Sequence, residues 1–144
     1  MTTESRAKTV GYWAATGLTA LAFITGGVFD AARGEQVRGI MSHLGYPVYF
    51  AALLGVWKVL GGLAILAPRF PRLKEWAYAG MFFDLSGAAI SHGSVGDPAA
   101  RVVTPLAILV LVVASWALRP KSRVLRGAET PAGASDRGRV PVAA

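Results

Sequence analysis

Two charged side chains stand inside long apolar runs of the sequence. Lys58 interrupts "GVWKVLGG" (residues 55–62), and Asp84 interrupts "FFDLSGAAISHG" (residues 82–93). An amine and a carboxylate in apolar surroundings can neutralise each other, relay a proton, or anchor the polar group of a ligand. Because an unpaired buried charge is costly, we expect these two residues to be partners, with either a structural or a functional role.

Three further polar residues could extend this chemistry toward one end of the runs. Ser91 and His92 follow Asp84 in the same run, with the histidine about 12 Å further along a helix, and Asp30 ends the first run on that same side. A neutral imidazole can bind a metal or pass a proton near neutral pH. An Asp30–His92 pair near the outer mouth is geometrically possible, and in a ligand pocket His92 should approach Asp30 or Asp84. We favour the simpler interpretation, a histidine that is hydrogen-bonded at the membrane interface.

No metal site is predicted, because His43 and His92 lack the spacing of metal ligands. The predicted polar path would be open at the outer end only. Leucines accumulate toward the other end of the second run, at Leu60, Leu63 and Leu66, and we expect them to close it. A path that is open at one end suits a ligand pocket or proton access and does not suit a channel.

The elements that must hold these residues are four apolar stretches, at residues 9–29, 48–67, 75–95 and 102–118. Each approaches the about 20 residues that a helix needs to cross a hydrocarbon core about 30 Å thick. Four buried helices of a soluble bundle are the alternative, but such helices keep a polar outer face, which the last stretch lacks. The sequence predicts an all-α fold, a four-transmembrane-helix bundle over residues 9–118 with up-down-up-down topology.

The proline-rich segment "APRFPR" (residues 67–72) makes the second and third helices an antiparallel hairpin. Lys58 lies about ten residues, or about 15 Å of helix, before Pro68. Asp84 lies about nine residues, or about 13.5 Å, after Glu75. The two charges should therefore meet at one depth, close to the centre of the bilayer.

Glycines accompany both charges at helical spacing. Gly55 and Gly62 share a helix face with the lysine, and Gly80 and Gly87 share one with the aspartate. Small residues let helix backbones approach closely inside a membrane. Both charges are therefore predicted to lie on packing faces rather than against lipid.

The distribution of Lys and Arg predicts the orientation. One side of the predicted bundle carries Arg6, Lys8, Arg69, Arg72, Lys74, Arg119, Lys121, Arg123 and Arg126, and the other carries Arg33, Arg38 and Arg101. The positive-inside rule places the first group, and with it both termini, in the cytoplasm. We expect a multi-pass protein of the cell membrane, with membrane lipid as a partner. Residues 127–144 are rich in Pro, Gly and small polar residues, which predicts a disordered C-terminal tail.

Composition excludes several functions. The 144 residues are 53% hydrophobic and 16% charged, whereas soluble domains carry about a quarter charged residues. There is no cysteine, which excludes disulfides and thiol chemistry. The net charge of +7 does not indicate nucleic-acid binding, because the positive residues lie between the apolar runs and at the ends. Phosphate-binding glycine loops and hydrolase triads are absent from the sequence, and whether the chain is an enzyme stays open.

The sequence resembles the DoxX-like family of small bacterial membrane proteins. The similarity rests on "LGYPVYFAALLGVWKVLGGLAIL" followed by "PRFPRLKEWAYAGMFFDLSGAAISH", and it covers roughly residues 10–120. The resemblance implies a four-helix membrane bundle with shared polar positions at Lys58, Asp84, Ser91 and His92. A distant relative, DoxD, is similar to a subunit of thiosulfate:quinone oxidoreductase, so the resemblance also suggests an association with quinone.

Two functions remain open at this point. The first is a non-catalytic accessory or subunit-type membrane module with Lys58 and Asp84 as its polar core. The alternative is a component of a membrane oxidoreductase that binds quinone, or another small lipophilic ligand, at Asp84 and His92. Either could act with a partner protein or as a homo-oligomer. The candidate residues for a ligand or proton path are Lys58, Asp84, Ser91, His92 and Asp30.

Overall fold

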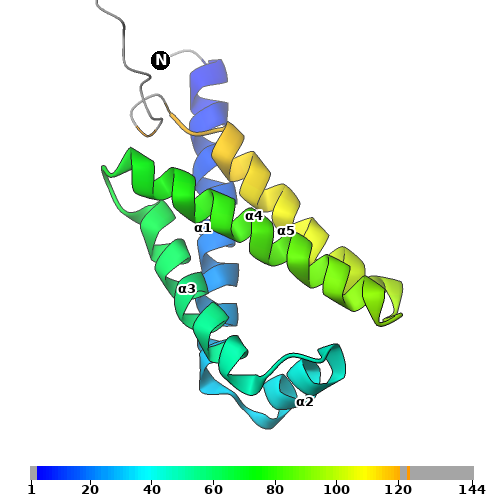
Figure 1. Ribbon diagram of the computed structural model, residues 1–144. Coiled ribbons are helices and arrows are strands. Elements are labelled where there is room, and N and C mark those ends of the chain that lie inside the picture. The colour runs from blue at the N-terminus through cyan, green and yellow to red at the C-terminus, as the bar shows by residue number, and fades with distance from the viewer. Residues whose placement is uncertain (1–2, 121–122, 124–144) are drawn as a thin grey trace, which may run out of the picture.

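The computed structural model describes residues 3–120 and 123, which form five helices and no strand (Figure 1). The helices are α1 (Thr3–Ala32), α2 (Glu35–Leu44), α3 (Val48–Leu66), α4 (Pro71–Ser94) and α5 (Ala99–Ala117). Four are long, alternate in direction and correspond to the four predicted stretches, while α2 lies at one end of the molecule. The tail at residues 127–144 lies outside the described residues.

The long helices form a ring in which α1 packs against α3 and α5, and α4 packs against the same two helices. A buried apolar cluster joins them, made of Ala20, Phe23, Ile65, Tyr78, Met81, Leu85 and Val112. The α1–α3 pair and the α4–α5 pair cross, and they diverge toward the end where α2 lies (Figure 1). The start of α1, the α3–α4 hairpin and the end of α5 all lie at the opposite end, which we call the hairpin end.

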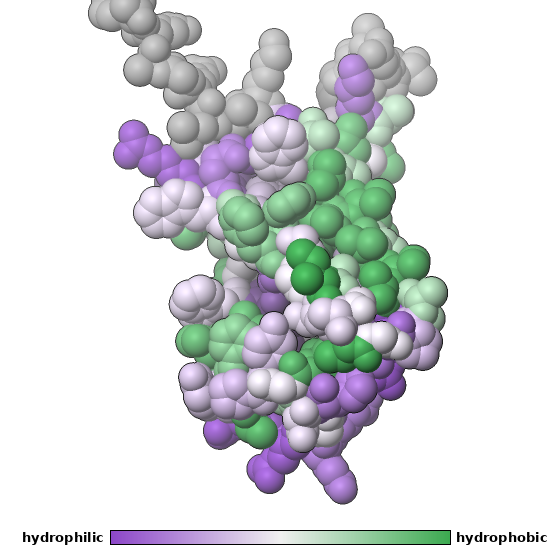
Figure 2. All heavy atoms as spheres, turned by 45° about the vertical axis from the view of Figure 1, so that its right-hand side comes forward, coloured by the Kyte–Doolittle hydropathy of each residue, from purple (hydrophilic) through white to green (hydrophobic). Residues whose placement is uncertain are grey.

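Three of the helices are long and apolar enough to cross a membrane: residues Arg6–Ala32 of α1, together with α3 and α5. α4 is not among them, because Asp84, Ser91 and His92 make it less apolar. Its surface is nevertheless apolar, since Phe83 and Ile90 are each 71% exposed. Figure 2 shows hydrophobic side chains over the upper and middle part of one face and hydrophilic ones toward its ends. Exposed apolar surface of this kind suits contact with lipid.

The helix α2 was not predicted, because its residues fall between the first two of the four apolar stretches. Apolar residues recur in it at helical spacing, at Val37, Ile40, Met41 and Leu44, and this signal could have revealed the helix. Gly45 ends α2 in the left-handed conformation (φ 77°), which a glycine adopts without strain. The Val37 side chain is 1% exposed, so α2 is anchored to the bundle.

Glycines bring α1 and α3 into close contact, as the sequence predicts for the α3 glycines. A Cβ atom on Gly55 would lie 2.5 Å from the backbone N of Ala31, and one on Gly27 would lie 2.6 Å from the carbonyl oxygen of Gly55. The same prediction is wrong for α4. A Cβ on Gly80 or Gly87 would meet no atom of the described residues within 4 Å. The close helix contact in this fold therefore belongs to α1 and α3.

Candidate functional site

Lys58 lies between two carboxylates that come from two other helices. Its Nζ atom donates a hydrogen bond to Asp30 Oδ2 of α1 at 2.8 Å and lies 3.6 Å from Asp84 Oδ2 of α4. The structure thus brings together the predicted Lys58–Asp84 pair and adds Asp30 as the closer partner. We call Asp30, Lys58 and Asp84 the ionic triad. When all three groups are ionised, the triad carries a formal charge of −1.

The close α1–α3 contact explains why Asp30 reaches Lys58. Asp30 follows Gly27 by three residues, so the two residues lie on neighbouring turns of one helix face. The lysine belongs to the same contact, because a Cβ on Gly27 would also lie 2.9 Å from the Lys58 Cβ. Helix backbones this close allow the lysine side chain to extend along α1 to the carboxylate.

A cavity of about 140 Å³ lies beside the triad, between all four long helices. It is lined by Ala22, Phe23, Gly26, Lys58, Asp84, Leu85 and Ile108, so Lys58 and Asp84 are its two charged groups. A dry cavity of about 150 Å³ is large enough to hold benzene. Figure 2 shows a hollow in the middle of one face with hydrophilic atoms at its base. Apolar walls with a few polar groups are typical of ligand sites, but those usually measure about 300–1,000 Å³, so this smaller cavity suits only a group about as large as benzene.

One atom of the triad lacks a hydrogen bond. Asp84 Oδ2 is buried and accepts no hydrogen bond from any described residue, since Lys58 Nζ is 3.6 Å away. A buried acceptor without a donor is unfavourable by about 1–3 kcal/mol. Asp84 also lines the cavity, but this oxygen is itself enclosed, so a small shift of the Lys58 ammonium group toward it would satisfy it.

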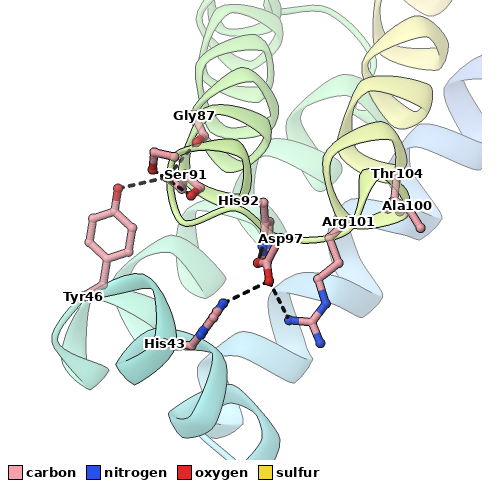
Figure 3. Close-up of polar contacts among 10 residues, drawn as sticks. His43, Tyr46, Gly87, Ser91, His92, Asp97, Ala100, Arg101 and Thr104 are labelled. Atoms are coloured by element: carbon pink, nitrogen blue, oxygen red, sulfur yellow. Dashed lines mark hydrogen bonds and ion pairs between the residues drawn. The ribbon is translucent and has the colours of Figure 1, made fainter.

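The possible Asp30–His92 pair does not form, because each residue has another partner, and His92 is hydrogen-bonded near the end of its helix, as the favoured interpretation has it. His92 Nδ1 lies 2.6 Å from Asp97 Oδ2, in the turn between α4 and α5 (Figure 3). His43 Nε2, from α2, lies 2.9 Å from the other oxygen of Asp97, and Arg101 Nη1 lies 3.6 Å from that oxygen. We call His43, His92, Asp97 and Arg101 the Asp97 cluster.

Asp97 was missed because its position depends on a turn. Gly96 adopts a positive φ of 74°, and the Asp97 amide donates to the carbonyl oxygen of His92 at 3.0 Å. This turn folds the aspartate back onto the histidine, a contact that helical spacing does not predict. The segment "GDP" after the apolar run was the available signal. The hydrogen bond from His92, helped by that from His43, lowers the pKa of Asp97 below its usual 3.8.

Ser91 also contacts the segment that follows α2. Its hydroxyl donates to the carbonyl oxygen of Gly87 at 2.8 Å and lies 3.0 Å from the hydroxyl of Tyr46, which follows α2 (Figure 3). Since the Ser91 proton is directed to Gly87, the tyrosine is the donor in this contact. Neither Ser91 nor His92 is among the residues that line the cavity. The structure therefore separates these two predicted site residues from Lys58 and Asp84.

The hairpin side of the cavity differs from the prediction. Leu60 and Leu63 are 58% and 51% exposed, so they face outward and do not close a path. Phe23 and Leu85 line the cavity and also belong to the apolar cluster that continues toward the hairpin end. This cluster, rather than the leucines, closes the cavity on that side.

Buried hydroxyls lie beyond this apolar cluster and were not predicted. Ser115 Oγ lies 2.7 Å from Thr16 Oγ1 and 2.7 Å from the Tyr78 hydroxyl, which joins α1, α4 and α5. Their sequence signal is weak, since single Ser and Thr residues are common in apolar helices. Hydrogen bonds between membrane helices contribute about 0.6 kcal/mol each on average, so these contacts are adequately explained as packing interactions.

The described residues contain no group of three or more His, Asp or Glu side chains that could hold a metal ion. In the Asp97 cluster, both oxygens of the carboxylate already contact basic side chains. The chemistry that the structure supports is therefore ionic pairing and hydrogen bonding. Its clearest position for a ligand is the cavity, where Lys58 and Asp84 are the two charged lining residues.

An all-helical ring with three membrane-length helices and charges paired in its interior defines a membrane protein. The model of the DoxX-like family matches residues 14–115, and the chain belongs to this family. A search of curated proteins and a search of solved structures each found no match.

Proposed function

We propose that this chain is a multi-pass protein of the cell membrane in which α1, α3, α4 and α5 all cross the bilayer and both termini are cytoplasmic. Support for α4 as the fourth span comes from its exposed Phe83 and Ile90 and from its packing between α3 and α5. Its charged residue within the span, Asp84, faces Lys58 instead of lipid. Support for the orientation comes from the basic residues at the hairpin end.

Reporter fusions test this topology. Reporters after Ala67 and after Arg126 should be cytoplasmic, and a reporter near Arg38 should be external. An external C-terminal reporter would overturn the orientation. If the reporters after Ala67 and after Arg126 lay on opposite sides of the membrane, only one of α4 and α5 could cross it.

Within this topology we propose an accessory or subunit-type membrane module that acts with a partner protein or as a homo-oligomer. The observation that carries this proposal is the ionic triad, which links α1, α3 and α4 through one lysine. A buried network of this kind specifies how helices pack, since each charge requires its partner. The role is then to present a defined helical surface in the membrane.

Affinity purification from native membranes tests the module. Wild-type protein should retain a stoichiometric partner or form a defined oligomer in mild detergent. The Lys58→Met variant should lose this association, whereas Arg38→Met, which changes an exposed basic residue of α2, should keep it. A monomer without any partner, for wild type in several detergents, would contradict the proposal.

The cavity favours a second function, the binding of a quinone or another small lipophilic molecule. Its walls are apolar, and its two charged lining residues are Lys58, an ammonium donor, and Asp84, a carboxylate acceptor. A carbonyl oxygen of the ligand would accept from Lys58, and a hydroxyl group would donate to Asp84. The ligand would enter from the lipid, in which such molecules dissolve.

Thermal stability of the purified protein tests this second function. A short-chain quinone or quinol should raise the midpoint of unfolding of the wild-type protein. Ala22→Phe should abolish the shift by filling the cavity, while Gly87→Phe, a position where a Cβ meets no described atom within 4 Å, should not. Equal shifts for both variants would assign the ligand to another place.

A further inference from the structure

The two ends of the molecule differ in their balance of positive and negative side chains. The hairpin end carries Arg6, Lys8, Arg69, Arg72, Lys74, Arg119 and Arg123, and Glu75 is the acidic residue whose side chain is described there. The opposite end carries Arg33, Arg38 and Arg101 together with Glu35 and Asp97. The hairpin end is therefore strongly positive, while the opposite end is nearly balanced.

Several of the basic residues at the hairpin end are used inside the fold. Lys74 is fully buried and donates to carbonyl oxygens at the end of α3, those of Ala64 at 2.9 Å and of Ala67. Arg119 donates to Glu75 at 2.8 Å. Such contacts satisfy the free carbonyl groups of a helix end and one carboxylate, so these charges are held in place.

Arg69 and Arg72 are different, because both are exposed and neither has a hydrogen bond or an ion pair with any described residue. They belong to the hairpin between α3 and α4, in which Arg69 and Phe70 adopt positive φ values of 65° and 52°. Left-handed backbone at two successive non-glycine residues is uncommon and makes a sharp turn. Arg69 lies in this turn and Arg72 in the first turn of α4, and both are exposed.

Exposed apolar side chains lie next to these two arginines in the sequence. Phe70 is 63% exposed, Leu73 is 46% exposed and Trp76 is 77% exposed. Aromatic rings with this exposure at the end of a membrane helix suit the headgroup region of a bilayer. Guanidinium groups suit phosphate, which they bind through two parallel hydrogen bonds.

We propose that the segment Pro68–Trp76 is a binding site for the headgroups of anionic phospholipids in the cytoplasmic leaflet. Arg69 and Arg72 bind the phosphate and the anionic headgroup, while Phe70 and Trp76 rest among the first carbons of the acyl chains. This site rests on the proposed four-span topology, because the hairpin must lie at the membrane surface. Binding of anionic lipid at this site would add to the orienting effect of the basic residues.

Lipid selectivity in nanodiscs tests the site. Protein is reconstituted in discs of phosphatidylcholine with a minor fraction of phosphatidylglycerol, and the lipids that stay bound are counted by native mass spectrometry. A basic residue near an anionic surface contributes roughly a fivefold preference, so Arg69→Gln/Arg72→Gln should reduce the preference for phosphatidylglycerol by about 25-fold. The matched control, Arg33→Gln/Arg38→Gln at the opposite end, should leave it unchanged.

Two further measurements keep the outcomes separate. Alkaline carbonate extraction shows first whether the wild-type protein spans the membrane, and its release would overturn the topology instead of the lipid site. A protein with Trp76 as its single tryptophan and both arginines intact should be quenched more strongly by brominated phosphatidylglycerol than by brominated phosphatidylcholine. Equal quenching, or equal losses in the hairpin variant and the control, would overturn the proposal.

Discussion

The ionic triad and the Asp97 cluster differ in their ratio of basic to acidic side chains. In the triad, one lysine serves two carboxylates within the ring of helices, and a buried oxygen of Asp84 is left without a hydrogen bond among the described residues. In the Asp97 cluster, one carboxylate receives two imidazoles and a guanidinium near the surface. The triad lies beside a cavity and keeps one enclosed carboxylate oxygen without a hydrogen-bond donor among the described residues, whereas both oxygens of Asp97 are engaged. The first arrangement can accept a ligand, and the second is suited to fastening α2 to the α4–α5 turn.

The surroundings of the two sites also differ. The side chains of the triad are 14–24% exposed, so all three groups are shielded. In the Asp97 cluster the side chains of Asp97 and His92 are only 7% and 17% exposed, but those of His43 and Arg101 are 48% and 54% exposed, so two of the three basic partners reach solvent. Charges that lack water depend on their partners for stability. Exposed ion pairs contribute little, because water screens them and solvates each group when the pair opens. Changes in the triad should therefore affect the whole bundle, and changes in the Asp97 cluster should act locally.

The largest effect is expected for Lys58→Met, which leaves two carboxylates near each other without a cation. Removing one partner from a buried ionic network typically destabilises a protein by about 3–5 kcal/mol. Asp30→Leu should have a smaller effect and Asp84→Leu the smallest of the three, since in each the lysine keeps one carboxylate and Asp84 is the more distant one. Thermal unfolding in detergent measures this order.

The triple change Lys58→Met/Asp30→Leu/Asp84→Leu should recover much of the stability that Lys58→Met loses, because it removes the stranded charges. Additive losses in the triple variant would show that the residues act independently. Such a result would remove the distinction between the triad and the Asp97 cluster.

The second prediction concerns the close contact that lets the triad form. In Gly55→Ala the added methyl group would lie 2.5 Å from the backbone of α1, so the helices must separate. Overpacking of this kind costs about 1–3 kcal/mol. Gly87→Ala is the matched control on α4, where the methyl group meets no described atom within 4 Å. If both variants unfold at the same temperature, the α1–α3 contact does not control the triad.

The sequence predicted the triad in part. The rise of a helix, counted from the proline-rich hairpin, placed Lys58 and Asp84 at one depth, and both lie beside one cavity. Asp30 was assigned to the outer mouth, because helix counting describes backbone positions and omits the length of a lysine side chain. The close approach of α1 at Gly27 was equally hidden, since it depends on which faces of two helices meet.

The Asp97 cluster was harder to predict, because it depends on two turns. His43 reaches Asp97 only because α2 forms and ends at Gly45, and Asp97 reaches His92 only because Gly96 reverses the chain. Apolar periodicity identifies long helices well, and the four predicted stretches correspond to α1, α3, α4 and α5. Contacts between polar residues across turns do not follow from this periodicity and are seen only in the folded structure.

The third prediction tests the fastening role of Asp97. Asp97→Asn keeps the turn but removes the charge that faces His43, His92 and Arg101, so α2 should open more often. Amide hydrogen exchange in α2 should become a few-fold faster, as expected for exposed ion pairs, while exchange in α3 and α4 near the triad should not change. Faster exchange throughout the bundle would show that the two sites are coupled.

The same variant gives a pH dependence with a defined sign. The folded protein holds the pKa of Asp97 below 3.8, so the stabilisation from this carboxylate is fully present above that value. It is lost as the pH falls through the lowered pKa and Asp97 becomes protonated. The difference in α2 protection between wild type and Asp97→Asn should shrink as the pH falls below about 4, where Asp97 itself takes up a proton. A difference that persists in strong acid would show that charge is not its origin.

The smallest effect is expected for Tyr46→Phe, which removes the single hydrogen bond from the tyrosine hydroxyl to Ser91 at 3.0 Å. The ring should keep its contact with Phe50, whose centroid is 5.4 Å away, and Ser91 keeps its bond to the carbonyl oxygen of Gly87. A hydrogen bond of this type contributes about 0.5–1.5 kcal/mol, and its partial exposure places it at the low end. Exchange in the last turn of α2 should accelerate about twofold, and Ser91→Ala should give the same change because it removes the same contact. When either substitution is combined with Asp97→Asn, α2 should open more often than in Asp97→Asn alone. The midpoint of thermal unfolding of the bundle, which depends on the triad, should not change. A fall of that midpoint in the double variant would mean that α2 supports the ionic triad itself.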